Sequence, residues 1–209
     1  MGRRTERLSI DNLGDLPEVA RRCVFYELDA VQRERARGRE EEAKRAWVAQ
    51  VLQEWGSCGR IVYVDDAYAG HVIWASAAMA PGTQVFATAP VSPDAVVVTS
   101  LMVAPQRRGN ALGKLLVQSM AKDVHRQGTH RAIECFAGGA LSASDTCTLP
   151  VAFWEAAGFC THREHPAYPR MRMDLRSTAT WREEVENAFG RLTAGMSRPA
   201  SARRSAISR

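Results

Sequence analysis

The chain has 209 residues, of which 45% are hydrophobic and 24% charged, proportions that suit a globular protein with a buried core. It contains no run of about 18 apolar residues, which argues against a transmembrane helix. The N-terminus also lacks the apolar stretch of a secretory signal and the residue pattern of N-myristoylation. Five cysteines without a CxxC spacing argue against a disulfide framework and favour the cytoplasm.

The formal net charge of +5 comes from the two ends of the chain. Residues 196–209 contribute +4 and residues 1–7 contribute +2, which leaves −1 over residues 8–195. A pI of about 9.2 therefore does not indicate a nucleic-acid-binding face. The Ser-, Ala- and Arg-rich tail 196–209 is expected to be disordered. A weak contact of this tail with nucleic acid or an acidic partner stays open.

The N-terminal quarter predicts one strand and two helices. The sequence "RLSI" (7–10) predicts a short strand. Residues 16–31 have apolar side chains at helical spacing and predict a helix with Pro17 in its first turn. Residues 39–55 predict a second helix, because its first turn is acidic and its tryptophans lie on an apolar stripe. The charged segment between these helices is expected to be a solvated helix end or loop.

The middle of the chain predicts three strands. The β-rich runs 60–66 and 71–77 predict a hairpin with "AYAG" as its connection. Residues 80–94 carry three prolines and predict a long loop of the kind that often serves function. Residues 95–103 are almost continuously apolar, which predicts a strand buried on both faces.

The rest of the chain alternates helices and strands. This order indicates the α/β fold class, with a mixed central β-sheet flanked by helices. We expect a single domain over residues 1–195, with a core at about 6–175 and an extra C-terminal helix at about 180–194 that starts with a capping box of Thr180 and Glu183. The expected elements before that helix are a helix over 112–124, a strand over 131–137, a loop over 138–147, a helix over 148–158 and strands over 159–164 and 170–175.

The stretch "VAPQRRGNALGKLL" (103–116) links the buried strand to a helix. A pyrophosphate needs converging backbone N–H groups, and the first turn of a helix supplies them together with a favourable dipole. Small residues let the ligand approach, and Gly109, Ala111 and Gly113 are small. Arg107 and Arg108 add charge-assisted hydrogen bonds.

Three phosphate-binding patterns can be compared with this stretch. "GNALGKL" is one residue too short for a P-loop and has no hydroxyl residue for magnesium. The Gly-x-Ala-x-Gly spacing is a poor dinucleotide fingerprint, because no acidic residue follows about twenty positions later. The third pattern, Gln/Arg-x-x-Gly-x-Gly/Ala, is satisfied completely by "QRRGNA" (106–111).

The third pattern resembles motif A of the GNAT N-acetyltransferase superfamily. "LMVAP" (101–105) is similar to the strand end that precedes this motif, and "FWEAAGF" (153–159) is similar to the later aromatic-Glu-x-x-Gly-Phe helix. The order of elements also resembles that of the family over roughly residues 6–175. The chain as a whole resembles bacterial members, a likeness that implies no acceptor.

The resemblance implies an N-acyltransferase that uses acetyl-CoA as cosubstrate and needs no metal. An amine of a small molecule or peptide would attack the acetyl carbonyl directly in a ternary complex, with the carbonyl pointing toward the end of the motif strand. The enzyme would hold the reactants together, polarise the carbonyl and move protons. The implied cofactor-binding residues are Leu101, Met102 and Val103 for the pantetheine arm, and Arg107, Arg108, Gly109, Asn110, Ala111, Leu112 and Gly113 for the pyrophosphate.

The chain departs from the family at the acid and the base. Trp154 stands where many members have the tyrosine that protonates the CoA sulfur, and an indole N–H is no acid at neutral pH. The motif strand lacks the acidic residue that often serves as base, and Asp94 lies too early in the chain to replace it. The general acid and base are therefore not identified.

Two weak catalytic candidates remain. Glu134 lies on the strand beside the motif strand and could act as a base through water, and the alternative is a paired carboxylate. Cys147 stands where members often have Asn and could contact the pantetheine or act as a thiol acid, and the alternative is a structural cysteine. Tyr26 and Glu27 lie in the region that lines the acceptor pocket in the family, although their residue types favour core or solvated roles over a place in the pocket.

The segment "CTHREH" (160–165) raises a metal question. Cys160 and His162 share a face of the expected strand, but with His165 they do not form a strong zinc spacing. No metal is therefore expected. No membrane partner is expected either, and a homodimer stays open.

Two classes of function follow from the sequence. The first is an acetyl-CoA-dependent N-acetyltransferase. The second is a catalytically weak or inactive CoA-binding sensor or interaction module, since the usual acid and base are missing. A third class, a nucleic-acid-associated protein that uses its basic ends, conflicts with the near-neutral body of the chain.

Overall fold

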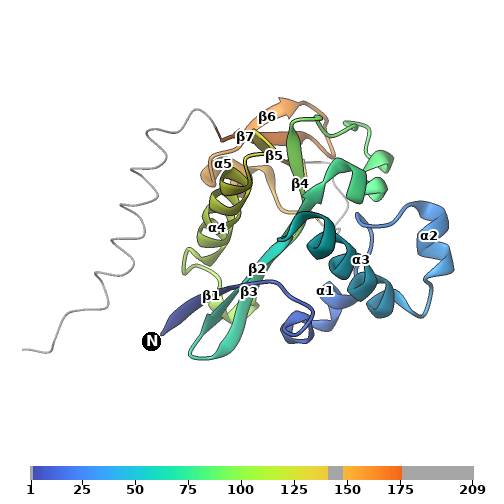
Figure 1. Cartoon of the computed structure of the whole chain (residues 1–209). Coiled ribbons are helices and arrows are strands. Elements are labelled where there is room, and N and C mark those ends of the chain that lie inside the picture. Colours follow the sequence, from blue (N-terminus) through green and yellow to red (C-terminus); the bar gives the residue numbers. More distant parts are fainter. Residues whose placement is uncertain (1, 141–147, 176–209) are drawn as a thin grey trace, which may run out of the picture. The chain divides into compact units, whose positions relative to one another are not determined.

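A seven-stranded mixed sheet organises the chain in the computed structural model, which describes residues 2–140 and 148–175 (Figure 1). The strand order is β1-β2-β3-β4-β5-β7-β6. All neighbours are antiparallel except β4 and β5, which are parallel. The strands are β1 Arg3–Arg7, β2 Gly59–Val64, β3 Ala67–Ser76, β4 Ala95–Val103, β5 Ala132–Phe136, β6 Cys160–Arg163 and β7 Arg170–Asp174.

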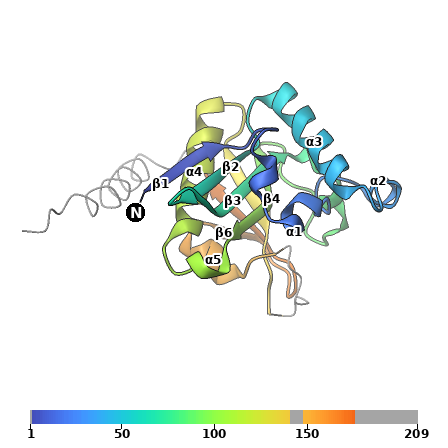
Figure 2. The same cartoon turned by 90° about the horizontal axis from the view of Figure 1, so that it is seen from below.

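Helices cover both faces of this sheet, as both views show (Figures 1 and 2). Helices α1 and α3 lie on one face, and α4 lies on the other. This layered arrangement confirms the predicted α/β class with a mixed sheet. The α-helices are α1 Glu18–Arg22, α2 Ala30–Arg35, α3 Glu40–Trp55, α4 Leu112–Gln127 and α5 Val151–Ala156, and the short 3₁₀ helices are η1 Leu13–Asp15, η2 Ala77–Met79, η3 Pro81–Val85 and η4 Pro105–Arg107.

The alternation of side chains along β2 and β3 sends alternate residues to each helical layer. Ile61 and Ile73 share one apolar cluster with Trp47 and Val51 of α3, and all four are almost fully buried. On the opposite face, Arg60 forms a bidentate ion pair with the Asp123 carboxylate of α4, with N···O distances of 2.6 and 2.8 Å. The sheet therefore separates two packed layers.

The first strand lies earlier than predicted. We expected it at 7–10, whereas β1 spans Arg3–Arg7. Ser9 and Asn12 form a local turn in which each side-chain oxygen accepts a hydrogen bond from the backbone N–H of the other residue, so the chain turns where the strand was expected.

The predicted helix over 16–31 is wrong as a single element, because α1 ends at Arg22 and α2 begins at Ala30. Two backbone carbonyls in the gap bond to distant groups. The Cys23 carbonyl accepts a hydrogen bond from Lys44 Nζ at 3.0 Å, and the Tyr26 carbonyl accepts one from the Gly82 N–H at 3.0 Å. These tertiary bonds replace the helical ones. The charged segment 32–38, expected as a helix end or loop, includes the end of α2.

The other predicted elements inside the described residues are found, with shifted ends. The predicted hairpin is β2–β3, but it turns at Asp65 and Asp66, which have φ values of 52° and 62°, while "AYAG" is part of β3. The strand over 95–103 matches β4, although only its first half is fully buried. The expected C-terminal helix at 180–194 and the tail 196–209 lie outside the described residues.

None of the helices in the described ranges has both the length and the apolar character required to cross a bilayer.

Candidate functional site

The parallel strands β4 and β5 separate in the middle of the sheet. Their pairing runs only from Ala95↔Ala132 to Val97↔Glu134, whereas β4 continues to Val103 and stays paired with β3 on its other side. Among the described residues, no strand pairs with the β5 side of β4 beyond Val97. The backbone of the second half of β4 therefore offers free N–H and C=O groups to an extended ligand.

A β-bulge marks the point of separation. Trp74 of β3 pairs with Val98, and the preceding Ile73 pairs with Ser100, so Thr99 is an extra residue on β4. Bulges of this kind bend a strand and redirect the side chains that follow. The Thr99 hydroxyl is buried and has no hydrogen-bond partner in the part of the chain that the structure describes.

The loop after β4 adopts the conformation that its sequence requires. Gly109 has a φ of 79° and Ala111 a φ of 58°, and Ala111 is the N-cap residue of α4. The Asn110 side-chain amide donates to the carbonyl oxygens of Arg107 and Arg108, at 3.1 and 3.3 Å. These bonds hold the loop closed around the start of the helix.

The start of α4 has several cationic and N–H groups that are unpaired among the described residues. Leu115 is the first residue of α4 whose amide donates a hydrogen bond to a carbonyl, that of Ala111 at 3.0 Å. The amides of Leu112, Gly113 and Lys114 therefore have no intrahelical acceptor. Within residues 2–140 and 148–175, neither Arg107, Arg108 nor Lys114 forms an ion pair. Together with the helix dipole, these groups favour an anionic ligand at this end.

Gly113 lies against the ring of Phe153. An added Cβ at this position would lie 2.8 Å from Cε2 and 3.1 Å from Cζ of that ring. The glycine therefore lets α5 pack closely against the first turn of α4. Gly109 has open space around its Cβ position and a positive φ, so backbone conformation alone explains that glycine.

Several solved structures share this architecture. A PaiA N-acetyltransferase from Thermoplasma acidophilum in complex with coenzyme A superposes with a TM-score of 0.55 and 14% identity, over 83% of this chain and 99% of that one. The yncA structure from Salmonella typhimurium with its cofactor acetyl-CoA gives 0.56 and 13%, over 84% and 95%. The loading GNATL domain of CurA from Lyngbya majuscula gives 0.53 and 13%, over 85% and 100%.

The chain has the GNAT fold. No family model and no curated protein sequence matches it, so the likeness rests on three-dimensional structure. The sequence resemblance over roughly 6–175 predicted this fold correctly.

Trp154 of α5 is buried. It stands at the position where, by the family resemblance, many members have a tyrosine. Only 3% of it is exposed, and its ring lies edge-on against Phe153 and Phe159, with centroids 5.2 and 4.9 Å away. Its indole Nε1 has no hydrogen-bond partner among the described residues. The side chain thus acts as a packing residue between α5 and the start of β6.

Glu134 lies beside the point where β4 and β5 separate, as expected, but it is fully paired. It is 0% exposed, its two oxygens lie 3.1 Å from Arg172 Nη1 and from Arg170 Nη1, and it accepts a hydrogen bond from the Ser92 N–H. Burial raises its pKa, but the Ser92 hydrogen bonds and the two arginines lower the pKa further, so the net shift is downward. The paired-carboxylate alternative fits these contacts, and a general-base role does not.

Asp94 is paired as well. Its carboxylate forms a bidentate ion pair with Arg172 at 2.9 and 3.0 Å, which lowers its pKa. It therefore has the properties of a structural anion.

Tyr26 and Glu27 both have core roles. Tyr26 is stacked on Phe86, with centroids 5.6 Å apart. Glu27 forms a buried ion pair with Lys44, and each side chain is 1% exposed. Neither side chain is available to line an acceptor pocket in this structure.

The remaining candidates are cysteines and histidines. Cys147 lies outside the described residues. Burial raises the pKa of Cys58 to about 12 and that of Cys135 well above its usual value, so neither is a reactive thiolate. The described residues contain no group of three or more His, Cys, Asp or Glu side chains that could hold a metal ion, and His165 Nδ1 accepts two backbone N–H bonds.

One polar chain was not predicted from the sequence. Tyr68 Oη lies 2.7 Å from His71 Nδ1, and His71 Nε2 lies 2.8 Å from Ser100 Oγ. The three residues come from β3 and the second half of β4. Tyr68 and His71 are three positions apart, which in a regular strand places them on opposite faces, so sequence spacing gave no signal.

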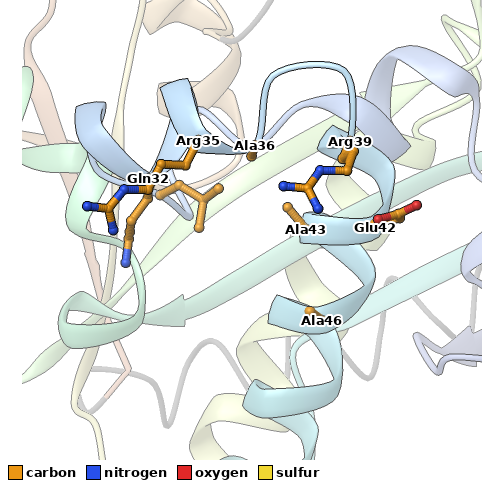
Figure 3. Close-up of a pocket in the computed structure, with 8 residues that line it drawn as sticks. Gln32, Arg35, Ala36, Arg39, Glu42, Ala43 and Ala46 are labelled. Atoms are coloured by element: carbon orange, nitrogen blue, oxygen red, sulfur yellow. The ribbon is translucent and has the colours of Figure 1, made fainter.

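A separate hollow of about 400 Å³ lies between α2 and the start of α3 (Figure 3). Arg35 and Arg39 contribute exposed guanidinium groups to it, and Glu42 contributes a carboxylate. The residues that line this hollow are distant in sequence from the loop after β4, and none of them is a predicted cofactor-binding residue. Its full lining is Leu28, Gln32, Arg35, Ala36, Arg39, Glu42, Ala43 and Ala46.

Proposed function

We propose that this protein binds acetyl-CoA and transfers the acetyl group to an amine. The observation that carries the proposal is the free edge of β4, which leads directly into a cationic loop and the unpaired amides of α4. An extended ligand with an anionic end fits that combination, and acetyl-CoA is such a ligand. Two solved structures of the same fold contain CoA or acetyl-CoA, which supports the choice.

The chain's own groups suggest how the cosubstrate is held. The pyrophosphate would accept hydrogen bonds from the amides of the loop between Arg107 and Gly113, with the two arginines adding charge. The pantetheine arm would pair with the backbone of Leu101, Met102 and Val103 as an additional strand. The thioester would then lie near the bulge at Thr99, where a backbone N–H can polarise the carbonyl.

The acceptor is an amine of a small molecule or a peptide, attacked in a ternary complex. Its nitrogen forms a bond to the carbonyl carbon, and the carbon–sulfur bond breaks to release CoA. The reaction needs no metal. The protein acts in the cytoplasm, as a monomer or as a homodimer.

Two glycine variants test the cofactor site. Gly109 and Gly128 lie just before and just after α4, both are exposed, both have positive φ (79° and 71°), and both have open space around the Cβ position. Gly109→Glu adds bulk and negative charge where the pyrophosphate is proposed to bind, whereas Gly128→Glu adds the same strain and charge at the far end. Isothermal titration with CoA measures affinity for both variants and the wild type.

We expect Gly109→Glu to weaken CoA binding by about tenfold or more, which corresponds to ~1.4 kcal/mol. Gly128→Glu should bind CoA like the wild type. Equal affinities for the two variants would show that the site lies elsewhere. No CoA binding by the wild type would refute the proposal as a whole.

A CoA-binding sensor without turnover is the second candidate function. The observation that favours it is Trp154, whose buried indole cannot donate a proton to the CoA thiolate. Incubation with acetyl-CoA and a panel of amines, aminoglycosides and peptides, followed by measurement of free thiol, separates the two functions. Thiol release above background supports the enzyme, and CoA binding with no thiol release across the panel supports the sensor.

A further inference from the structure

A continuous hydrogen-bonded chain runs from Tyr68 through His71 to Ser100. The two links are 2.7 and 2.8 Å long. His71 in the middle is 0% exposed, whereas Tyr68 and Ser100 at the two ends are partly exposed. The chain thus connects two partly exposed residues through a buried imidazole, and burial raises the pKa of the Tyr68 hydroxyl.

Ser100 occupies a specific place relative to the proposed thioester. It follows the bulge at Thr99 and precedes Leu101, on the stretch of β4 whose β5 side is unpaired. Because Ser100 pairs with Ile73, which packs in the α3 cluster, its side chain lies on the face of the sheet opposite α4. An amine that approaches from that face would meet the Ser100 hydroxyl beside the carbonyl.

The surroundings of His71 keep its ring neutral. Burial, and secondly the positive charge of Lys44, lower its pKa to about 3. The other titratable groups near it are Tyr68, Glu27, which neutralises Lys44, and the Cys58 thiol close to that ion pair. A neutral imidazole has one N–H and one lone pair. It can therefore accept a proton at one nitrogen while it releases another from the second nitrogen.

We propose that Ser100, His71 and Tyr68 form a relay that removes the proton of the attacking ammonium, an inference that rests on the proposed function. The ammonium proton moves to Ser100 Oγ, the Ser100 hydroxyl proton moves to His71 Nε2, the His71 Nδ1 proton moves to Tyr68 Oη, and the Tyr68 hydroxyl proton passes to water. The amine is left neutral and nucleophilic. No residue of the relay keeps a net charge, which suits a buried ring.

Each outward proton transfer along these three residues leaves His71 in its other tautomer. The nitrogen becomes cationic when the carbon–nitrogen bond forms, and it releases its second proton to solvent as the amide is made. The CoA thiolate formed in the same turnover needs one proton. A solvent proton that moves inward along the same three groups protonates the thiolate and restores the starting tautomer. The relay therefore supplies the acid that is missing at the position of Trp154 and the base that is missing from the motif strand.

The choice of acceptor tests this relay. n-Butylamine is almost fully protonated at pH 7.5 and must lose a proton before it attacks, whereas hydroxylamine is largely neutral at that pH. We expect Ser100→Ala to lower kcat/KM for n-butylamine by about 10²-fold, the ordinary contribution of a positioned base. For hydroxylamine, measured above its uncatalysed reaction with acetyl-CoA, we expect a loss of only roughly threefold.

Matched controls separate the relay from general damage. Thr99→Val removes the neighbouring buried hydroxyl, which has no hydrogen-bond partner within residues 2–140 and 148–175, and should leave the ratio of the two rates unchanged. Tyr68→Phe should lower the n-butylamine rate selectively. Tyr63→Phe, which removes only the phenol bond to Asp15 at 2.6 Å, should not. CoA titration of every variant shows that the cofactor site is intact.

The outcomes are distinct. Equal losses for both acceptors in Ser100→Ala, or no loss for either, would overturn the relay while leaving the proposed function in place. A wild-type protein that binds acetyl-CoA but releases no thiol with these two acceptors or with the wider panel would refute the proposed function itself, and the relay with it. A selective loss with n-butylamine in both Ser100→Ala and Tyr68→Phe supports the relay.

Discussion

Glu134→Gln should strongly destabilise the fold. The carboxylate is 0% exposed and lies 3.1 Å from both Arg170 and Arg172, so the variant removes the buried counter-charge that both guanidinium groups share, while Arg172 keeps its pairs with Asp94 and Asp174. Removal of one partner from a buried ion pair costs about 3–5 kcal/mol. Urea denaturation at pH 7, followed by far-UV circular dichroism, measures the free energy of unfolding.

Asp174→Asn is the matched control for this variant. Asp174 bonds the same Arg172 at 2.8 Å, but its side chain is 58% exposed, and exposed pairs contribute only about 0–1 kcal/mol. The comparison holds the arginine constant and changes the burial of its partner. If Glu134→Gln loses no more stability than Asp174→Asn, burial does not control the strength of this network and the reasoning is refuted.

Acid should reduce the difference between wild type and Glu134→Gln. The net effect of its surroundings lowers the folded-state pKa of Glu134 below its unfolded value of about 4.3. A depressed carboxyl pKa contributes stability that is complete above the unfolded value and is lost as the pH falls through the folded value. Unfolding free energies measured from pH 6 down to pH 3 should therefore converge, and a constant difference would contradict the charge-based explanation.

Two further predictions concern the loop and first turn of α4. Ala111→Gly should stabilise the protein by about 1 kcal/mol, because alanine at a φ of 58° is strained, and a thermal melt should show a rise of about 2–4 °C. Gly113→Ala should cost about 1–3 kcal/mol, because the new methyl group overlaps the Phe153 ring, and Phe153→Leu in the same chain should recover part of the loss in a denaturation double-mutant cycle.

The sequence predicted the elements whose packing is local and periodic. Strand β4 is a run of buried apolar residues, and α4 has leucines at helical spacing that follow a loop of small residues. The loop itself was also predicted, because the positive φ of Gly109 and the start of the helix depend on residues that lie next to one another. These features need no knowledge of distant segments.

Distant contacts decided the elements that were mispredicted. Strand β1, "RRTER", has no apolar alternation, and it exists because its backbone pairs with β2 at the edge of the sheet. The helix expected over 16–31 breaks where Lys44 and Gly82 bond the carbonyls of Cys23 and Tyr26. Tertiary hydrogen bonds of this kind override a helical pattern and leave no trace in local spacing.

The proposed relay depends on the same kind of distant contact, together with one irregularity of the sheet. In a regular strand, Ser100 would share a face with Val98, which pairs with Trp74, and would lie on the α4 side, away from His71. The extra residue Thr99 reverses this alternation, so that Ser100 lies on the face of Ile73 and within 2.8 Å of His71. The bulge lies where β4 separates from β5, and it brings a hydroxyl group to the proposed acceptor side. No spacing rule applied to "VVVTSLMV" reveals this irregularity.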